Sequence, residues 1–266
     1  MSNIQNAFAN GKAFIGFITG GDPGMAKTKE FVLEMARAGA DLIEIGVPFS
    51  DPIAEGPVIQ EANIRALRAG ATVDKLFSLV EDIRKEIDTP LVFLTYLNPV
   101  FHYGRANAEA GYEAFFKRAQ SAGLDGIIIP DLPFEEQSEV RDTSCRYGID
   151  LISLIAPTSE ERIKEIAADA AGFIYLVSSM GVTGVRREIT TDLEPIVTAL
   201  RAVTKLPAAV GFGIHTPEQA AQMAKAADGV IVGSAIVKII AEHGEAAAPY
   251  LYQYVKKMKE AITAVT

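Results

Sequence analysis

The sequence predicts an α/β fold, a single (β/α)8 TIM barrel with a short N-terminal helical extension, occupying residues 1–266 as one domain. The chain has 266 residues, close to the ~250 typical of this barrel. A short motif, in which a helix ends in Ala or Gly and a β-branched run follows, recurs along the chain, as at 37–43 and 121–129. No Pro/Ser-rich linker or shift in composition interrupts the repeats, so no domain boundary is predicted.

Variants of the motif occur at 147–152, 170–175 and 226–231. Glycine at a helix C-terminus supplies the left-handed cap, and the continuous apolar run after it is typical of a strand buried on both faces. Repetition of helix, cap and buried strand indicates a parallel sheet built from βαβ units.

Eight strands are predicted along the chain, with helical patterns between them. The strands are expected near 13–19, 42–47, 91–96, 126–130, 150–155, 173–177, 207–211 and 229–232. The helices are expected at 27–38, 73–87, 110–122, 135–147, 160–168, 193–203 and 217–226, with a short run at 235–240 and an amphipathic tail at 246–264. An open doubly wound sheet is the alternative, but it seldom needs eight evenly spaced repeats.

Composition limits the environment of the protein. Hydrophobic residues make up 49% of the chain, enough for a large core. No apolar run approaches the ~20 residues that cross a bilayer, and the N-terminus has no signal-peptide pattern. Cys145 is the only cysteine, which excludes an internal disulfide. We therefore predict a reduced, cytoplasmic protein.

The formal charge of −9 is spread along the sequence. Nucleic acid and anionic membranes are poor partners for such a surface. A phosphorylated metabolite remains compatible with it, because backbone N–H groups bind phosphate without a basic patch. His102, His215 and His243 share no metal-ligand spacing, so no metal site is predicted.

Two carboxylates stand out in the stretch 43–56. Glu44 lies inside an apolar strand, and Glu55 lies in the Gly/Pro-rich loop that follows. Strand alternation puts Glu44 on the same face as Leu42 and Gly46. A lone ionised carboxylate there costs several kcal/mol unless it is paired or protonated.

Glu44 and Glu55 are the candidate acid/base pair. Burial should raise the pKa of Glu44 and let it both give and take a proton near neutral pH. The alternative is a buried glutamate bonded to a neighbour and a solvated Glu55. The position of Glu44 inside a strand near the expected catalytic rim favours chemistry for that residue.

Glycine-containing turns follow the last three predicted strands. They are Gly181–Gly184, Gly211–Gly213, and Gly233 with Ser234. Glycine lets the backbone approach an anion, and N–H groups at a helix start bind one. The three turns together predict a phosphate site at one rim of the barrel. Apolar and aromatic residues near strand ends line a pocket for an aromatic substrate or simply fill the barrel: Phe17, Leu94, Tyr96, Tyr175 and Phe212.

These residues resemble a known family. The run 43–56 is similar to the signature of the tryptophan synthase α subunit family, and so are 17–23, 177–184, 211–214 and 232–238. The resemblance extends in order from about residue 13 to about residue 240. It implies cleavage of indole-3-glycerol phosphate into indole and glyceraldehyde 3-phosphate, a carbon–carbon lyase reaction in tryptophan biosynthesis that needs no cofactor in this chain.

The resemblance also implies residue roles. Glu44 would protonate the indole ring at C3 and take the proton of the glycerol hydroxyl, and Glu55 would hold the indole N–H. Thr183 matches a loop threonine that closes onto the second carboxylate. Gly184, Gly213, Gly233 and Ser234 match the phosphate cradle, and Phe17, Leu94, Tyr96, Tyr175 and Phe212 match positions around the indole.

The resemblance further implies a β partner in an α2β2 assembly, with pyridoxal phosphate expected only in that partner. Asp51, Asn98, Pro99 and Phe101 resemble the docking face, which is otherwise an ordinary solvent-exposed rim. Two positions depart from the common pattern: Glu55 is often Asp in the family, and Ser179 replaces a basic residue of some members.

Two other functions fit parts of the pattern. One is another phosphate-binding TIM-barrel isomerase or epimerase, which needs its own acid/base placement and often a metal. The other is a non-catalytic activator of a β partner. The Glu44/Glu55 pair argues against both.

Overall fold

A computed structural model describes residues 2–104, 111–177, 193–211 and 213–265. Within these ranges the strands form one nine-stranded parallel sheet in the order β5-β4-β3-β2-β1-β9-β8-β7-β6. The strands are β1 (Ala13–Thr19), β2 (Leu42–Gly46), β3 (Leu91–Leu94), β4 (Gly126–Ile128), β5 (Asp150–Leu151), β6 (Ser153–Ile155), β7 (Ile174–Val177), β8 (Ala208–Gly211) and β9 (Gly229–Val232).

The two ends of this sheet order are pieces of one extended segment. β5 pairs with β4, while β6, which starts two residues after β5 ends, pairs with β7. The segment 150–155 therefore pairs with β4 through its first part and with β7 through its last part, which closes the sheet into a barrel. Counted as one strand, β5 and β6 bring the number of barrel strands to eight. The prediction of a (β/α)8 TIM barrel is confirmed.

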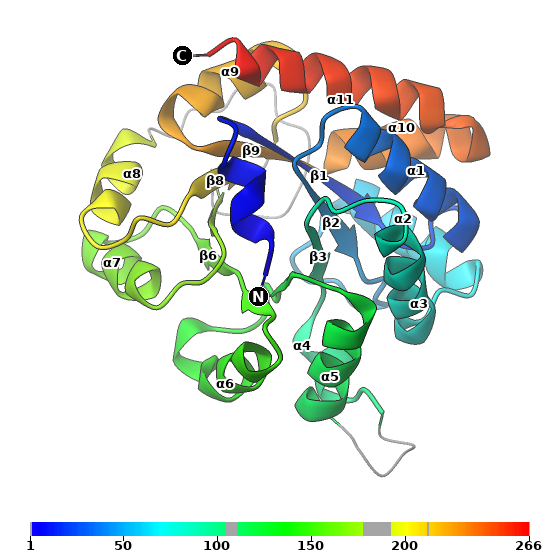
Figure 1. The fold of residues 1–266 in the computed structure, drawn as a ribbon, viewed down its shortest axis with the longest axis horizontal. Helices are drawn as coiled ribbons and strands as arrows, with labels where there is room; N and C mark the ends of the chain where they lie inside the picture. Colours follow the sequence, from blue (N-terminus) through cyan, green and yellow to red (C-terminus); the bar gives the residue numbers. More distant parts are fainter. Residues whose placement is uncertain (1, 105–110, 178–192, 212, 266) are drawn as a thin grey trace.

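Helices surround the strands (Figure 1). They are α1 (Met25–Arg37), α2 (Pro57–Arg68), α3 (Val73–Arg84), α4 (Leu97–Phe101), α5 (Tyr112–Ala122), α6 (Ser138–Arg146), α7 (Glu160–Ala168), α8 (Glu194–Arg201), α9 (Pro217–Ala226), α10 (Ser234–His243) and α11 (Ala248–Thr263), with short 3-10 turns η1 (Ile4–Phe8), η2 (Phe134–Glu136) and η3 (Gly244–Ala246). Two helices, α2 and α4, lie where the sequence predicts only loops.

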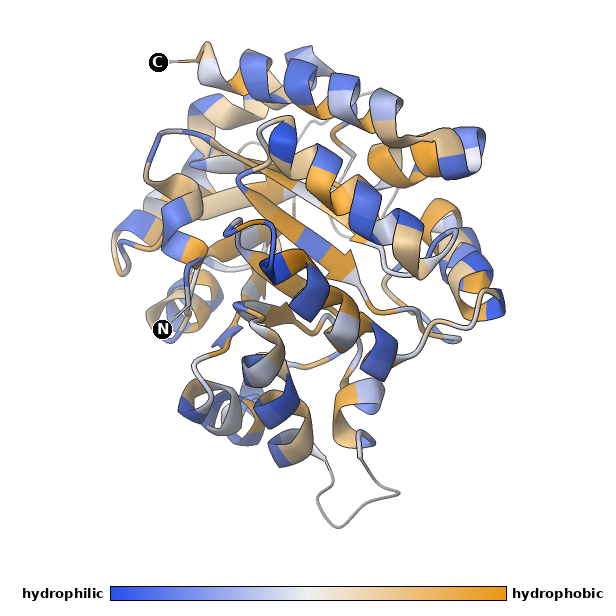
Figure 2. Ribbon diagram, turned by 45° about the vertical axis from the view of Figure 1, so that its right-hand side comes forward, coloured by the Kyte–Doolittle hydropathy of each residue, from blue (hydrophilic) through white to orange (hydrophobic). Residues whose placement is uncertain are grey.

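The strands separate two cores by the alternation of their side chains. Ile43, Ile45 and Val47 belong to the large core between sheet and helices, whereas Leu42 belongs to a smaller cluster inside the barrel. The inner cluster takes apolar residues from around the ring: Ile15, Leu42, Val92, Ile128, Ile152, Tyr175, Ala209 and Ile231. Apolar segments of the strands and the inward stripes of the helices are visible in Figure 2. Glu44, two residues after Leu42, therefore shares its inner face.

The predicted N-terminal helical extension is the turn η1. Ile4 is fully buried and Ala7 nearly so, and both join the inner cluster. Phe8 packs against Phe173 with ring centroids 5.8 Å apart. A Cβ on Gly126 would lie 2.8 Å from Ile4 Cδ1, so η1 fits closely against the start of β4. The turn thus covers the amino end of the barrel.

Three aspartates, each just before a strand, accept hydrogen bonds from backbone N–H groups at the amino ends of the neighbouring strands. Asp41, before β2, accepts from the N–H of Phe14 in β1 at 2.7 Å and from Lys259 Nζ of α11 at 2.7 Å. Burial raises the pKa of Asp41, and the bonds from Lys259 and Phe14 oppose that rise.

The same arrangement recurs twice. Asp125, before β4, accepts from the N–H of Leu91 at 2.9 Å and pairs with Arg84 of α3. Asp228, before β9, accepts from the N–H of Ala208 at 2.8 Å and pairs with Arg201 of α8. Each carboxylate joins two strands and a helix, because it binds one backbone donor and one cation. These buried or half-buried bonds stabilise the end of the barrel remote from the strands' carboxyl termini.

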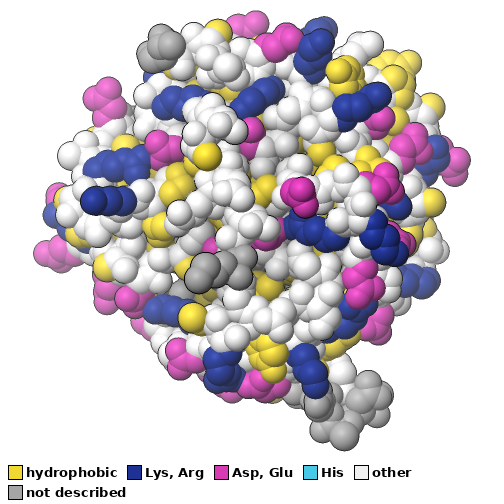
Figure 3. All heavy atoms as spheres, in the orientation of Figure 1, with side chains coloured by type: hydrophobic (Ala, Val, Ile, Leu, Met, Phe, Trp, Pro, Cys, Tyr) yellow, Lys and Arg dark blue, Asp and Glu magenta, His cyan; other side chains and the backbone are white. Residues whose placement is uncertain are grey.

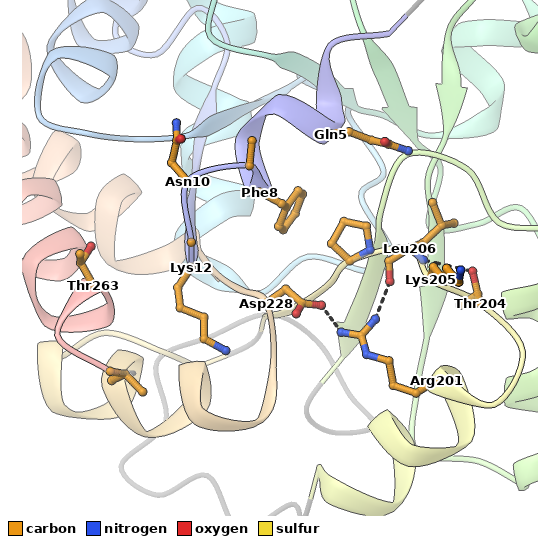
Figure 4. A pocket seen from close by; sticks show the side chains of 14 residues that line it. Gln5, Phe8, Asn10, Lys12, Arg201, Thr204, Lys205, Leu206, Asp228 and Thr263 are labelled. Atoms are coloured by element: carbon orange, nitrogen blue, oxygen red, sulfur yellow. Dashed lines mark hydrogen bonds and ion pairs between the residues drawn. The ribbon is translucent and has the colours of Figure 1, made fainter.

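A cavity of about 1120 Å³ opens beside this amino end, between η1, the segment before β8 and the end of α11 (Figure 4). Two of its cations already have partners within the protein. Lys12 Nζ donates to the carbonyl of Ala227 at 2.8 Å, and Arg201 bonds Asp228 and the carbonyl of Leu206. The positive charges of Lys12 and Arg201 therefore stabilise the fold through bonds within the protein.

Acidic and basic side chains are interspersed over the face drawn in Figure 3, which agrees with the even spread of charge along the sequence. Among the described residues, no helix combines the length and the apolar character required to cross a bilayer.

Candidate active site at the carboxyl end of the barrel

Glu44 lies in β2 with its side chain inside the barrel. In the sheet register it stands beside Phe17 of β1 and Val92 of β3. The residue is 1% exposed, and neither carboxylate oxygen has a hydrogen-bond partner among the described residues. A buried carboxyl group without partners is costly for the fold, so its presence requires a reason other than stability.

Burial is the main cause of a raised pKa for the Glu44 carboxyl group. Desolvation, followed by the negative charge of Glu55, raises the pKa of Glu44 from 4.5 to about 8. Most Glu44 side chains are therefore protonated at pH 7. A carboxyl group with a pKa near the working pH serves well as both acid and base.

Glu55 is also buried, with 4% exposure. The alternative of a solvated loop residue is wrong for it. Its backbone is tied on both sides: its N–H donates to the carbonyl of Pro52 at 3.2 Å, and Gln60 Nε2 donates to its carbonyl at 2.7 Å. The preceding N–H, of Ala54, donates to Tyr96 Oη at 3.0 Å. These bonds hold the second carboxylate near the first.

Tyr175 of β7 faces the two carboxylates from across the barrel. Its side chain is 7% exposed, and burial together with the charges of Glu44 and Glu55 raises its pKa well above the ordinary value. Gly211 of the neighbouring β8 makes room for the ring, since a Cβ there would lie 2.7 Å from Tyr175 Oη. The structure thus brings Tyr175 and the carboxylate pair together.

Phe17 occupies the space beside Glu44. The ring is 4% exposed and packs with Ile59 and Ala62 of α2 and with Val237 of α10. Gly46, which shares a face with Glu44, accommodates the Phe17 ring, since a Cβ there would lie 2.6 Å from Phe17 Cζ. Close packing of the ring, not empty volume, explains the glycine.

Gly46→Ala is expected to displace the Phe17 ring, because buried neighbours leave it little room to move. Overpacking of this kind costs about 1–3 kcal/mol, and we expect kcat/KM to fall as well. The matched control is Gly24→Ala, whose added methyl group meets nothing within 4 Å in an extended backbone. Urea unfolding and steady-state kinetics of both variants check this; equal behaviour of the two would show that the ring adapts freely.

Two further candidates for the substrate pocket, Leu94 at the end of β3 and Tyr96 shortly after it, lie in different surroundings. Leu94 touches both the inner cluster and the Phe17 cluster. Tyr96 is 2% exposed, stacks on Phe49 with centroids 5.3 Å apart, and accepts the Ala54 N–H. Burial and the charge of Glu55 raise its pKa. Tyr96 therefore supports the Glu55 loop as well as standing near that carboxylate.

Three residues of the predicted phosphate cradle, Gly213, Gly233 and Ser234, follow the neighbouring strands β8 and β9. Gly213 follows β8 with a φ of +87°, a conformation suited to glycine. Gly233 is the N-cap of α10 and, as a glycine, offers no side chain to cap it, and Ser234 is the first residue of the helix. A Cβ on Gly233 would lie 3.4 Å from Phe17 Cβ, so this helix start adjoins the carboxylate site. Thr183, Gly184 and Phe212 lie outside the described residues.

Sequence reasoning missed two residues at this rim. Thr19 ends β1 opposite Gly46, is 1% exposed, and its hydroxyl has no partner among the described residues. Gln60 holds the Glu55 backbone. Thr19 could have been identified from the sequence, because it is a polar residue at the end of an otherwise apolar strand. Gln60 could be identified only once the helix α2 is known. In the described ranges, no cluster of three or more His, Cys, Asp or Glu side chains could hold a metal ion.

Comparison with known proteins agrees over the whole chain. A family model described as "Tryptophan synthase alpha chain" matches residues 4–264. The curated tryptophan synthase alpha chain of Lactiplantibacillus plantarum is 51% identical over 263 residues, covering 98% of this chain and 97% of its own.

Solved structures give the same picture. The crystal structure of a tryptophan synthase alpha chain from Legionella pneumophila superposes with a TM-score of 0.87 at 36% identity, covering 100% of this chain and 98% of that one. A second structure comes from work on the mutual activation of the tryptophan synthase α2β2 complex of Pyrococcus furiosus. The matching chain has a TM-score of 0.83 at 35% identity, covering 94% of this chain and 99% of that one.

Proposed function

Because the chain belongs to the tryptophan synthase alpha chain family, we propose that it cleaves indole-3-glycerol phosphate into indole and glyceraldehyde 3-phosphate. The observation that carries this proposal is the buried Glu44 carboxyl, whose pKa is raised to about 8 by burial and by the charge of Glu55, which is also buried. The reaction is the carbon–carbon lyase step that supplies indole for tryptophan. No observation favours the isomerase or epimerase alternative, nor a purely non-catalytic activator.

The cleavage needs one proton delivered and one removed. Protonated Glu44 gives its proton to C3 of the indole ring, which leaves positive charge on the ring nitrogen. Glu55, as a carboxylate, holds the indole N–H and balances that charge. Glu44, now ionised, takes the proton of the adjacent glycerol hydroxyl while the bond from that carbon to ring C3 breaks. The bond's electron pair returns to the ring, and Glu44 ends protonated as it began.

The remaining rim residues bind the substrate in this proposal. Phe17, Leu94, Tyr96, Tyr175 and Phe212 surround the indole, and Gly184, Gly213, Gly233 and Ser234 hold the phosphate at the start of α10. Thr183 closes onto Glu55. The chain needs no cofactor for these steps, since a carboxyl group performs both proton transfers, and pyridoxal phosphate belongs to the β partner.

Contact with a β subunit forms part of the proposal. Phe101 is 45% exposed at the end of α4, the same helix holds Asn98 and Pro99, and Asp51 lies in the loop after β2. The helix α4 begins directly after Tyr96, whose hydroxyl holds the Glu55 loop. A β subunit docked on α4 in an α2β2 assembly would therefore act on Glu55 through Tyr96, and we propose that it orders this loop. We further propose that residues 1–266 form one domain and that the protein works in the cytoplasm.

The direct test is indole release from indole-3-glycerol phosphate by the purified chain, alone and with a β subunit. We expect release in both cases and faster release with the partner. The chain contains no Trp, so optical detection of indole has little background. No release under either condition would contradict the lyase assignment, and turnover unchanged by β would contradict ordering of the Glu55 loop.

The pH dependence of kcat/KM should report the acidity of Glu44. The first step uses its protonated form, so activity is expected to be level below pH 8 and to fall above it, by about tenfold per pH unit. The breakpoint corresponds to the raised pKa of about 8. Glu55→Gln removes the neighbouring negative charge and should move the breakpoint to lower pH. An activity that rises through pH 8 would assign the starting form to ionised Glu44 instead.

A further inference from the structure

A buried ion pair joins the loop after β1 to α2. Arg65 Nε and Nη2 donate to Asp22 Oδ1 and Oδ2 at 2.9 and 2.8 Å. The Asp22 side chain is 1% exposed and that of Arg65 is 34% exposed. The two parallel bonds fix both distance and orientation. Buried pairs contribute little net stability compared with apolar residues of the same volume, so the geometry that this pair imposes is the more informative property.

The helix on one side of the pair carries Glu55. α2 starts two residues after Glu55, and Gln60 in its first turn donates to the Glu55 carbonyl. Ile59 and Ala62 of the same helix pack on the Phe17 ring. Any displacement of α2 therefore moves the second carboxylate and one wall of the site together.

The loop on the other side of the pair is anchored to the strand that carries Glu44. The N–H of Gly20 donates to the carbonyl of Gly46, at the end of β2, at 2.8 Å. Gly21 has a φ of +87°, and a Cβ there would lie 2.7 Å from the Cβ of Ala71, shortly after α2. The loop is thus held tightly between β2 and the far end of α2.

From these contacts we propose that Asp22 and Arg65 are positioning residues for the cleavage reaction, which set the place of Glu55 relative to Glu44 through α2. Neither side chain touches the reacting atoms in this proposal. The path is short: Glu44 in β2, the Gly46–Gly20 bond, the Asp22–Arg65 pair, α2 and Glu55. The inference rests on the proposed lyase function.

The chain offers a matched control for a merely structural role. Arg84 pairs with Asp125 at the amino end of the barrel, with side chains 18% and 6% exposed. Breaking it also leaves a buried carboxylate without its cation, but far from the carboxyl rim. Arg84→Met and Arg65→Met therefore each remove the cation of a buried aspartate, at opposite ends of the barrel, and Arg84→Met also removes bonds to the carbonyls of Gly123 and Thr89.

The experiment measures kcat, KM and the pH profile of indole release for both variants, together with urea unfolding. Arg65→Met is expected to lower kcat about 10- to 100-fold, since small misplacement of a catalytic group is costly, with KM changed less than about twofold. Its pH breakpoint should move to lower pH, because the Glu55 charge lies farther from Glu44. Arg65→Lys, which keeps the charge, should recover part of kcat. Arg84→Met should keep kcat and the breakpoint while losing stability.

Two results would overturn the proposal. One is the wild-type kcat in Arg65→Met; the other is an equal loss in Arg65→Met and Arg84→Met with the pH breakpoint unmoved. If Arg65→Met does not fold, Arg65→Lys and Asp22→Glu carry the same comparison, and an unchanged kcat in both would count against positioning. Absence of indole release by the wild-type chain would instead refute the lyase function itself.

Discussion

Glu44→Gln is expected to reduce indole release by about a thousandfold or more, since general acid–base groups contribute on the order of 10²–10⁴ and Glu44 serves twice in the cycle. Glutamine keeps the shape of the side chain but neither gives nor takes the proton. Binding of indole-3-glycerol phosphate should stay within a few-fold of the wild type. Initial rates and calorimetric titration check both parts, with Glu61→Gln, on the exposed side of α2, as the control. A variant with wild-type turnover would leave only the binding role for this chain.

The same substitution should change how stability depends on pH. The pKa of Glu44 is about 8 when folded and near 4.5 when unfolded, so between these values the folded chain keeps a proton that the unfolded chain releases. This contribution is fully present below pH 4.5 and is lost as pH rises through 8, by on the order of 5 kcal/mol. Other groups are common to both proteins, so the wild-type free energy of unfolding should fall relative to that of Glu44→Gln between pH 5 and 9. Parallel curves would mean that Glu44 is ionised in the fold.

Replacement of Glu55 is expected to have the second largest effect. Glu55→Ala should lose most of the activity, about 100-fold or more, because nothing then balances the charge on the indole nitrogen. Glu55→Asp should retain part of it, since the carboxylate remains but is one methylene shorter. The bonds from Gln60 and to Tyr96 hold the loop backbone, which limits how far it can move to restore the contact.

Rates of the two Glu55 variants, compared with those of Glu61→Gln, distinguish these effects from general disturbance of α2. Near-wild-type rates in both Glu55 variants would remove this residue from the mechanism. An Asp variant as slow as the Ala variant would show that the backbone does not adjust at all.

The barrel was predictable because its signal is local and repeated. Each cap and apolar run indicates a strand by itself, and segment 150–155 was predicted as one strand although its halves pair with different neighbours. The helix α2 was missed because it follows directly on the Gly/Pro-rich run that ends at Pro57, which reads as loop. Yet Pro57 in its first turn and Arg65 and Arg68 in its last are ordinary signs of a helix.

The site was predictable in its strand residues and less so in its loop. Alternation alone places Glu44 on one face with Leu42 and Gly46, and the structure shows that the Leu42 face is the inside of the barrel. The burial of Glu55 depends on α2 and on Tyr96 after β3, which are contacts between distant segments that no local pattern contains. The crowding of Gly46 by Phe17 is likewise a property of two strands together.

The aspartates that precede β2, β4 and β9 sit at the end of the molecule opposite the carboxylate pair. Their bonds involve the first residues of β1, β3 and β8 and cations from α11, α3 and α8, at the amino ends of the strands and away from the two carboxylates. The scaffold is in this sense modular. A laboratory evolution campaign could randomise the loops at the carboxyl rim toward other indole or phosphate substrates, and the fastening at the opposite end would tolerate much of that variation.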